Sequence, residues 1–180
     1  QHSRFPWSKP VGPRLFLNRG IKDGQIQFED VTGQAGLTTL TMKCPHVEIR
    51  DFDNDGWPDI YVSTFKFANG KVYPVIFRNQ GVTNGMVHFA DYAMAVNDFP
   101  TPDYAKLVRS PTRFTDKMNI DRKITYAVAA PCGDYDKDGR IDIFVAEWWA
   151  ENPSFLLHNE TRGGNWIEVV VDNVPGINRM

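Results

Sequence analysis

Two short stretches of this sequence carry regularly spaced aspartates that could bind metal ions. Both fit the pattern D-x-D-x-D-G-x-x-D, with aspartates at positions 1, 3, 5 and 9. The first loop spans residues 51–59, and its aspartates are Asp51, Asp53, Asp55 and Asp59. The second loop spans residues 134–142, and its aspartates are Asp134, Asp136, Asp138 and Asp142. Calcium takes about six to eight oxygen ligands, and alternate carboxylates of a tight loop can all point toward one ion. The pattern therefore predicts two Ca²⁺ sites, one in each loop.

The residues between the aspartates fit the same interpretation. Gly56 and Gly139 stand at position 6, where a bend can bring the next backbone carbonyl onto the ion. We therefore expect the carbonyls of Trp57 and Arg140 to complete the two sites. Without a cation, four carboxylates in so small a loop repel one another.

Other metal sites fit less well. An EF-hand has a glutamate at position 12 and flanking helices, whereas position 12 here is Val62 or Val145, among β-forming residues. Magnesium keeps its own waters, and zinc favours His and Cys, of which only Cys132 is near. A solvated acidic turn remains as the alternative, but the repetition of all nine positions argues against it.

The two loops differ in charge. The first has four aspartates and no basic residue, a formal charge of −4, whereas Lys137 and Arg140 bring the second to −2. Because the number of charged ligands helps to set calcium affinity, we expect the second site to bind more weakly.

The loops belong to a longer repeat. Residues 46–65 match residues 127–147 in pattern, and a second element ends in an asparagine three times, as LFLNRG, VIFRNQG and FLLHNET, at Asn18, Asn79 and Asn159. Hairpin turns are predicted at Asp23-Gly24, Asn84-Gly85 and Gly163-Gly164. The unit reads as strand, acidic loop, strand, strand ending in Asn, turn and strand, which spans roughly 60 residues.

A four-stranded repeat of this length predicts an all-β fold made of β-propeller blades. The chain holds about two and a half blades, so we expect it to be part of a larger propeller or assembly. The predicted segments are the closing strands of a preceding blade (1–45), a first repeat (46–96), an insertion loop (97–123), a second repeat (124–171) and the start of a further region (172–180).

The motifs DFDNDGWPDIYV and GDYDKDGRIDIFV resemble the FG-GAP and VCBS repeats of integrin-α-type β-propellers. The ending, GGNWIEVVVDNVPGINRM, is similar to the ASPIC/UnbV region that follows such repeats in cartilage-acidic-protein-like proteins. The resemblance implies calcium in a hairpin loop of each blade and an extracellular or cell-surface setting. It also implies a structural, adhesion or protein-interaction role, with a protein partner or neighbouring copies of the chain.

Two other functions stay open. A carbohydrate-binding module would use exposed aromatics such as Trp148 or Trp149 to stack on a glycan. A non-catalytic accessory domain of a secreted enzyme is the other alternative. The chain itself is not expected to be an enzyme, because no nucleophile elbow, phosphate loop or dinucleotide fingerprint occurs.

Composition excludes further classes. A formal net charge of −2 gives no indication of nucleic-acid binding, and no apolar run approaches the ~20 residues of a membrane span. The start shows neither Met nor a signal-like segment, which is expected of a processed chain or a fragment. Cys44 and Cys132 are compatible with one bridge or with two free thiols. Asn159 begins a glycosylation sequon. The histidines at 46, 88 and 158 are interpreted as ordinary surface or strand residues.

Overall fold

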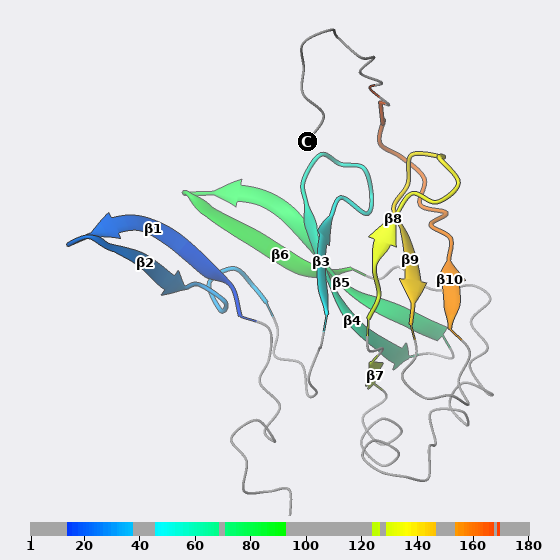
Figure 1. The fold of residues 1–180 in the computed structure, drawn as a ribbon, viewed down its shortest axis with the longest axis horizontal. Helices are drawn as coiled ribbons and strands as arrows, with labels where there is room; N and C mark the ends of the chain where they lie inside the picture. Colours follow the sequence, from blue (N-terminus) through cyan, green and yellow to red (C-terminus); the bar gives the residue numbers. More distant parts are fainter. Residues whose placement is uncertain are drawn as a thin grey trace, which may run out of the picture.

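The computed structural model describes residues 14–37, 46–68, 71–92, 124–126, 129–146, 154–167 and 169. These residues form antiparallel β-sheets and contain no helix, which confirms the all-β prediction (Figure 1). Within this part of the chain, no helix has the length and apolarity that crossing a membrane requires. The insertion loop, Cys44 and the pair Trp148-Trp149 lie outside the described residues.

The strands of the described residues are arranged in three sheets. A two-stranded sheet contains β1 (Phe16–Lys22) and β2 (Gln25–Asp30). A five-stranded sheet has the order β3 (Val47–Arg50), β4 (Asp59–Ala68), β5 (Lys71–Thr83) and β6 (Met86–Tyr92), with β7 (Ile124–Tyr126) also paired to β4. A three-stranded sheet has the order β10 (Phe155–Leu157), β9 (Asp142–Val145) and β8 (Cys132–Gly133).

Two of the predicted hairpin turns are confirmed. Asp23 and Gly24 join β1 to β2 with φ of 52° and 74°, and Asn84 and Gly85 join β5 to β6 with φ of 52° and 75°. Two successive left-handed residues match the right-handed twist of the flanking strands, and Asn, Asp and Gly adopt that conformation most readily. The turns fix the register of both hairpins.

The repeat asparagines build a bulge in each hairpin. The register shifts just past Asn18 in β1 and just past Asn79 in β5. In both cases the side-chain Oδ1 accepts the backbone N–H two residues on, from Gly20 at 2.8 Å and from Gly81 at 2.9 Å. The two glycines have φ of 84° and 83°, which the bulge requires. Equivalent sequence therefore gives equivalent local structure.

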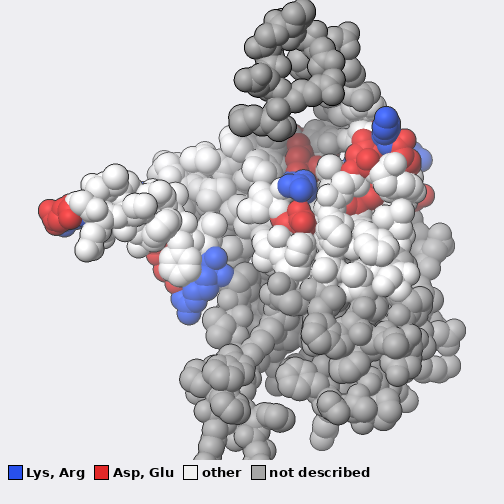
Figure 2. All heavy atoms as spheres, viewed as in Figure 1, with Lys and Arg blue, Asp and Glu red and all other residues white. Residues whose placement is uncertain are grey.

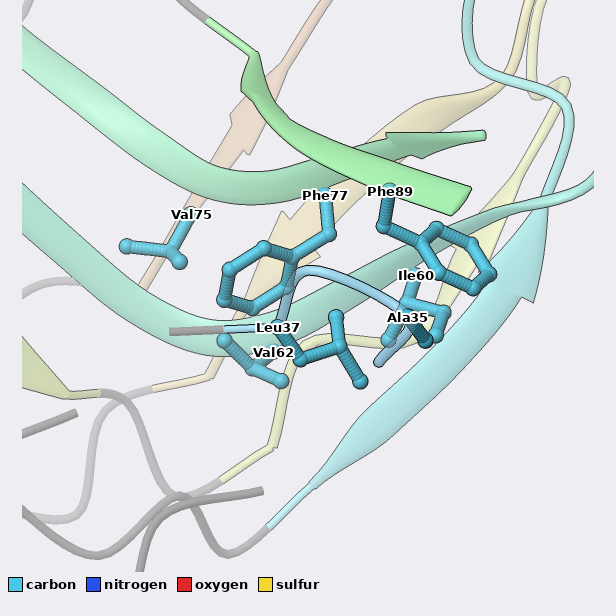
Figure 3. Close-up of a cluster of buried hydrophobic side chains, with 7 residues drawn as sticks. All are labelled: Ala35, Leu37, Ile60, Val62, Val75, Phe77 and Phe89. Carbon is cyan, nitrogen blue, oxygen red and sulfur yellow. The ribbon is translucent and has the colours of Figure 1, made fainter. Parts of the chain in front are cut away.

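A hydrophobic core cluster lies on the five-stranded sheet (Figure 3). It gathers apolar side chains of β4, β5, β6 and the turn at 31–37, namely Ile60, Val62, Val75, Phe77, Phe89, Ala35 and Leu37. The turn is tied to the sheet because the N–H of Phe89 donates to the carbonyl of Ala35 at 2.8 Å. This core holds β4, which follows the first loop, against β5.

The β1–β2 hairpin is a less covered counterpart of the β5–β6 hairpin. Phe16 and Phe28 stand where Phe77 and Phe89 stand relative to the repeat asparagine. Their side chains are 54% and 63% exposed, whereas those of Phe77 and Phe89 are 0% and 9% exposed. Among the described strands, β1 has no neighbour equivalent to β4.

The end of the second repeat differs from expectation. Residues 165–167 were predicted to begin a strand that follows the turn at Gly163-Gly164, but they are not part of a sheet. The two glycines have φ of 121° and 68°, and the chain then lies close to both loops. A Cβ on Gly164 would collide with Asn54, and one on Gly139 would collide with the ring of Trp166. Gly164 and Trp166 therefore lie against the loops, and residues 164–166 are not paired with β10.

Candidate metal centres

The first loop folds around its own first aspartate. The two carboxylate oxygens of Asp51 accept the backbone N–H groups of Asp55 at 3.1 Å and Gly56 at 2.8 Å. Asn54 and Gly56 have φ of 55° and 92°, which turns the chain tightly enough for these bonds to form. The Gly at position 6 therefore serves the loop bend, as the sequence predicted.

The ninth aspartate anchors the loop to the sheet. Asp59 begins β4, is fully buried, and accepts the N–H of Phe52 at 3.1 Å and the N–H of Asn79 at 2.8 Å. The side-chain amide of Asn79 donates to the carbonyl of Pro58 at 3.0 Å. Burial raises the pKa of Asp59 to about 6, and the charges of Asp53 and Asp55 add to that rise against the two hydrogen bonds. A cation beside Asp59 would reverse this effect.

Three carboxylates of the first loop converge. One oxygen each of Asp51, Asp53 and Asp59 lies within 4.8 Å of the others, so the three could hold a metal ion. The side chain of Asp53 is only 7% exposed. Its Oδ1 is buried and has no hydrogen-bond partner among the described residues. A buried carboxylate oxygen without a partner is costly, and a bound cation would satisfy it.

Arg78 on β5 occupies the outer side of the first loop. Its Nε lies 2.6 Å from Asp53 Oδ2, and its Nη2 lies 3.0 Å from Asp55 Oδ2. Asp55 also accepts the N–H of Trp57 at 2.9 Å. Asp55 is therefore turned toward the guanidinium and is outside the group formed by the other three aspartates.

The second loop repeats the internal hydrogen bonds of the first. Asp134 accepts the N–H groups of Asp138 at 3.1 Å and Gly139 at 2.9 Å. Asp142, which is 1% exposed, accepts the N–H of Asn159 at 2.8 Å. Lys137 takes the left-handed conformation at position 4, with φ of 62°. Two segments 83 residues apart thus fold into the same loop.

A second group of three carboxylates converges here. Asp134, Asp136 and Asp142 each offer an oxygen within 4.8 Å of the others, and they could hold a metal ion. Asp138 is outside this group: it pairs with Nη2 of Arg140 and lies 3.1 Å from Nε2 of His158. With Asp136 and His158 it forms another group that could hold a metal ion. The positions that converge, 1, 3 and 9, are the same in both loops.

His158 is a functional residue that the sequence reasoning missed. It precedes Asn159 as Arg78 precedes Asn79, and it faces the aspartates at positions 3 and 5 of its own loop, as Arg78 does. The ordinary surface role expected for it is therefore incomplete. The matching place in the repeat is the signal that could have found it.

The charges of Asp138, Arg140 and His158, beside the second group of aspartates, influence one another. Burial raises the pKa of Asp138, but hydrogen bonds from the Arg140 backbone and from His158, with their charges, leave it below its usual value. The hydrogen bond to Asp138 raises the pKa of His158 despite an opposing effect of burial. These three residues thus form a set of paired charges beside the converging aspartates.

The other predicted residues can now be placed. Trp57 and Arg140 stand at position 7, just after the glycine bend, and their carbonyl ligation stays a prediction. Asn159 is 6% exposed, and its Nδ2 donates to the carbonyls of Phe52 and Ile141 at 2.9 and 3.1 Å. A glycan on this nitrogen would disturb both bonds.

In the described part of the chain Cys132 is a free thiol, and burial raises its pKa to about 12.

Both loops lie at the same end of their sheets. The β3–β4 and β8–β9 connections run to that end in Figure 1, and acidic and basic groups gather there in Figure 2. The side-chain amide of Asn54 in the first loop donates to the carbonyl of Gly139 in the second at 2.9 Å. The arrangement places two groups of carboxylates next to each other, each able to bind a cation.

Comparison with known proteins gives no relative from which a function could be inferred. A scan against protein-family models, a search of curated proteins and a search of solved structures each found no match to this chain. The function is therefore inferred from the two loops and the strands that position them.

Proposed function

We propose that this chain is a calcium-binding β-propeller segment of an extracellular or cell-surface protein. Its role is structural, and its surface serves adhesion or protein interaction rather than catalysis. Each Ca²⁺ is held by one acidic loop and fixes the connection between two strands of a blade. The partner is another protein or neighbouring copies of the same chain.

The observation that carries this proposal is the buried carboxylate group of the first loop. Asp53 has a buried oxygen with no hydrogen-bond partner in the described residues, and it lies beside Asp51 and the buried Asp59. Three carboxylates that would otherwise repel one another become favourable around a divalent cation. The second loop supports the proposal because it has the same three positions and the same backbone bonds.

Calcium suits the donors better than other common metals. The converging residues of both loops offer only carboxylate oxygens, which hard cations prefer. Magnesium demands near-ideal octahedral geometry and retains its waters, whereas calcium accepts flexible cages built by one loop. Zinc would favour nitrogen or sulfur, and one such ligand, His158, forms a separate group with Asp136 and Asp138.

The propeller arrangement is supported by the repeat itself. In each repeat the strand after the acidic loop pairs with the strand that leads to the repeat Asn, as β4 with β5 and β9 with β10. In each, the Asn backbone N–H donates to the ninth aspartate. The resemblance of the two loops to FG-GAP and VCBS repeats agrees with blades of this kind and implies the extracellular setting.

Calcium stoichiometry tests the proposal. Isothermal titration of the full chain should give two ions per chain, and Asp53→Ala and Asp136→Ala should each remove one. Glu29→Gln is the matched control, because it removes a carboxylate charge on the β1–β2 hairpin, where Glu29 pairs with Arg19. Magnesium at the same concentration should bind more weakly. Binding that survives both Asp substitutions, or no binding by the folded chain, would refute the proposed site.

A second candidate function is calcium-dependent glycan binding. Half-exposed aromatics surround the two loops: Trp57 in the first, Tyr135 in the second, and Trp166 against Gly139, with 47%, 56% and 51% of their surfaces exposed. Aromatic faces stack on sugar rings. A glycan array probed with and without EGTA would favour this function if it gave a calcium-dependent signal that Trp57→Ala abolished.

A further inference from the structure

The two acidic loops are hydrogen-bonded directly to each other. Asn54 Nδ2 of the first loop donates to the carbonyl of Gly139 in the second at 2.9 Å. Asn159 Nδ2, on the chain that follows β10, donates to the carbonyl of Phe52 in the first loop, also at 2.9 Å. These bonds join residues 85 and 107 positions apart in the sequence. They connect the two repeats at the metal-binding end.

One of these bonds completes a continuous path between the ninth aspartates. Asp142 accepts the backbone N–H of Asn159, whose side chain donates to the carbonyl of Phe52. The N–H of Phe52 in turn donates to Asp59. Phe52 and Asn159 are 1% and 6% exposed, so this path is shielded from water. Displacement of either ninth aspartate would therefore disturb the hydrogen bonds of the other.

The second bond connects the bends of the loops. Gly139 donates its N–H to Asp134, and its carbonyl accepts from Asn54. Asn54 lies between Asp53 and Asp55 and has a φ of 55°. With both loops in these tight conformations, its side chain reaches Gly139. Nothing equivalent is available to Lys137, the residue at position 4 of the second loop, because a lysine offers only an exposed ammonium group on a long, flexible chain.

We infer that Asn54 and Asn159 are positioning residues that couple the two cation sites, so that an ion in one loop raises the affinity of the other. This inference rests on the proposed calcium function. A loop must be ordered to bind its ion, and a loop already ordered by its neighbour loses less conformational entropy on binding. Because the coupling is reciprocal, either ion can bind first.

The test compares two substitutions at equivalent positions. Asn54→Gly removes the bond to Gly139 and keeps a residue that tolerates positive φ, and Lys137→Gly is the matched change at position 4 of the second loop. Titration calorimetry of the full chain with CaCl₂ gives both stepwise constants. The wild type and Lys137→Gly should show the second ion favoured by about tenfold over independent sites. Asn54→Gly should lose most of that factor.

Each result has a distinct meaning. Two ions bound independently by the wild type, with the same pattern in Asn54→Gly, would overturn the coupling and leave the calcium function standing. No bound ion in the wild type would overturn both.

Amide exchange supplies a second readout that does not need the Asn54 variant. In Asp53→Ala, which is expected to leave only the second site working, calcium should still slow exchange of the Phe52 N–H through Asn159. The same experiment on Asp53→Ala with Asn159→Ser should show that protection reduced. Exchange at Phe52 that ignores calcium in Asp53→Ala would contradict the coupling.

Discussion

The two acidic loops share a backbone and differ in what surrounds it. In both, the first aspartate accepts two loop N–H groups and the ninth accepts the N–H of the repeat asparagine. The outer side differs, because Arg78 faces the first loop and His158 faces the second. The comparison teaches that the repeat fixes the loop's shape through position-specific backbone bonds. Neighbouring side chains then set the charge that a cation meets.

The largest effect is expected from the ninth aspartate. Asp59→Ala would leave the N–H groups of Phe52 and Asn79 without their buried acceptor and would remove a candidate ligand. We expect unfolding free energy to fall by about 3 kcal/mol and one calcium site to disappear. Urea denaturation in millimolar calcium measures the first, and titration calorimetry the second. Asp55→Ala is the control, since it should lower stability much less; equal losses would contradict the anchoring role of Asp59.

The two position-6 glycines separate backbone strain from packing. A Cβ on Gly56 meets nothing within 4 Å, so Gly56→Ala should cost only the strain of a φ of 92°, about 1–2 kcal/mol. Gly139→Ala has a similar φ and also collides with Trp166, so its loss should be roughly twice as large. Denaturant unfolding gives both values. Trp166→Ala should remove the excess in Gly139→Ala; an unchanged excess would show that Trp166 is not its cause.

The pKa of Asp59 predicts how stability without calcium depends on pH. Its folded pKa is about 6 against an ordinary 3.8, so the folded chain holds this proton more tightly than the unfolded chain. That contribution to stability is present below pH 3.8 and is lost as pH rises through about 6. In EGTA the melting temperature should therefore fall by about 5 °C between pH 4.5 and pH 7. Asp59→Asn should flatten this slope; a wild-type melting temperature that rises over the range would oppose the prediction.

The smallest effect should come from Arg78 and His158, the basic residues that face the first and the second loop. Arg78→Met removes a cation that competes with calcium for Asp53, so the first site should bind calcium about fivefold more tightly. His158→Gln should tighten the second site less, and this effect should fade as pH rises through the raised pKa of His158, because the imidazole then loses its charge. Calcium titration at pH 6 and pH 8 measures both changes. Equal effects of the two substitutions at pH 8 would contradict the expected difference between Arg78, which stays charged, and His158, whose charge fades as pH rises.

Much of each loop could be predicted from local sequence. The aspartates at positions 1, 3 and 9, the glycine bends and the turns at Asp23-Gly24 and Asn84-Gly85 depend on residues close together in the chain. Such features follow from backbone preferences that the residue types reveal. The repeat asparagines were predictable for the same reason, because Asn18 and Asn79 each accept a backbone N–H from only two residues further on.

The rest depends on contacts between distant segments. Arg78 lies 23 residues beyond Asp55, and the bond from Asn54 to Gly139 spans 85 residues. No local pattern reports how the two repeats pack against each other. The strand expected at 165–167 fails for a similar reason, since Gly164 and Trp166 contact the loops instead of a neighbouring strand. Asp55 and Asp138 carry the right spacing, but they pair with Arg78 and His158, which come from segments about 20 residues further along the chain.

The most direct test is a crystal structure of the full chain grown in millimolar calcium, with anomalous diffraction data to identify the ions. One Ca²⁺ should occupy each loop, with carboxylate oxygens of positions 1, 3 and 9 and the carbonyl of Trp57 or Arg140 at roughly 2.3–2.6 Å. Asp53 Oδ1, buried and without a hydrogen-bond partner in the described residues, should be a ligand. A structure in which Arg78 and His158 remain against their aspartates and neither loop contains an ion would contradict calcium binding.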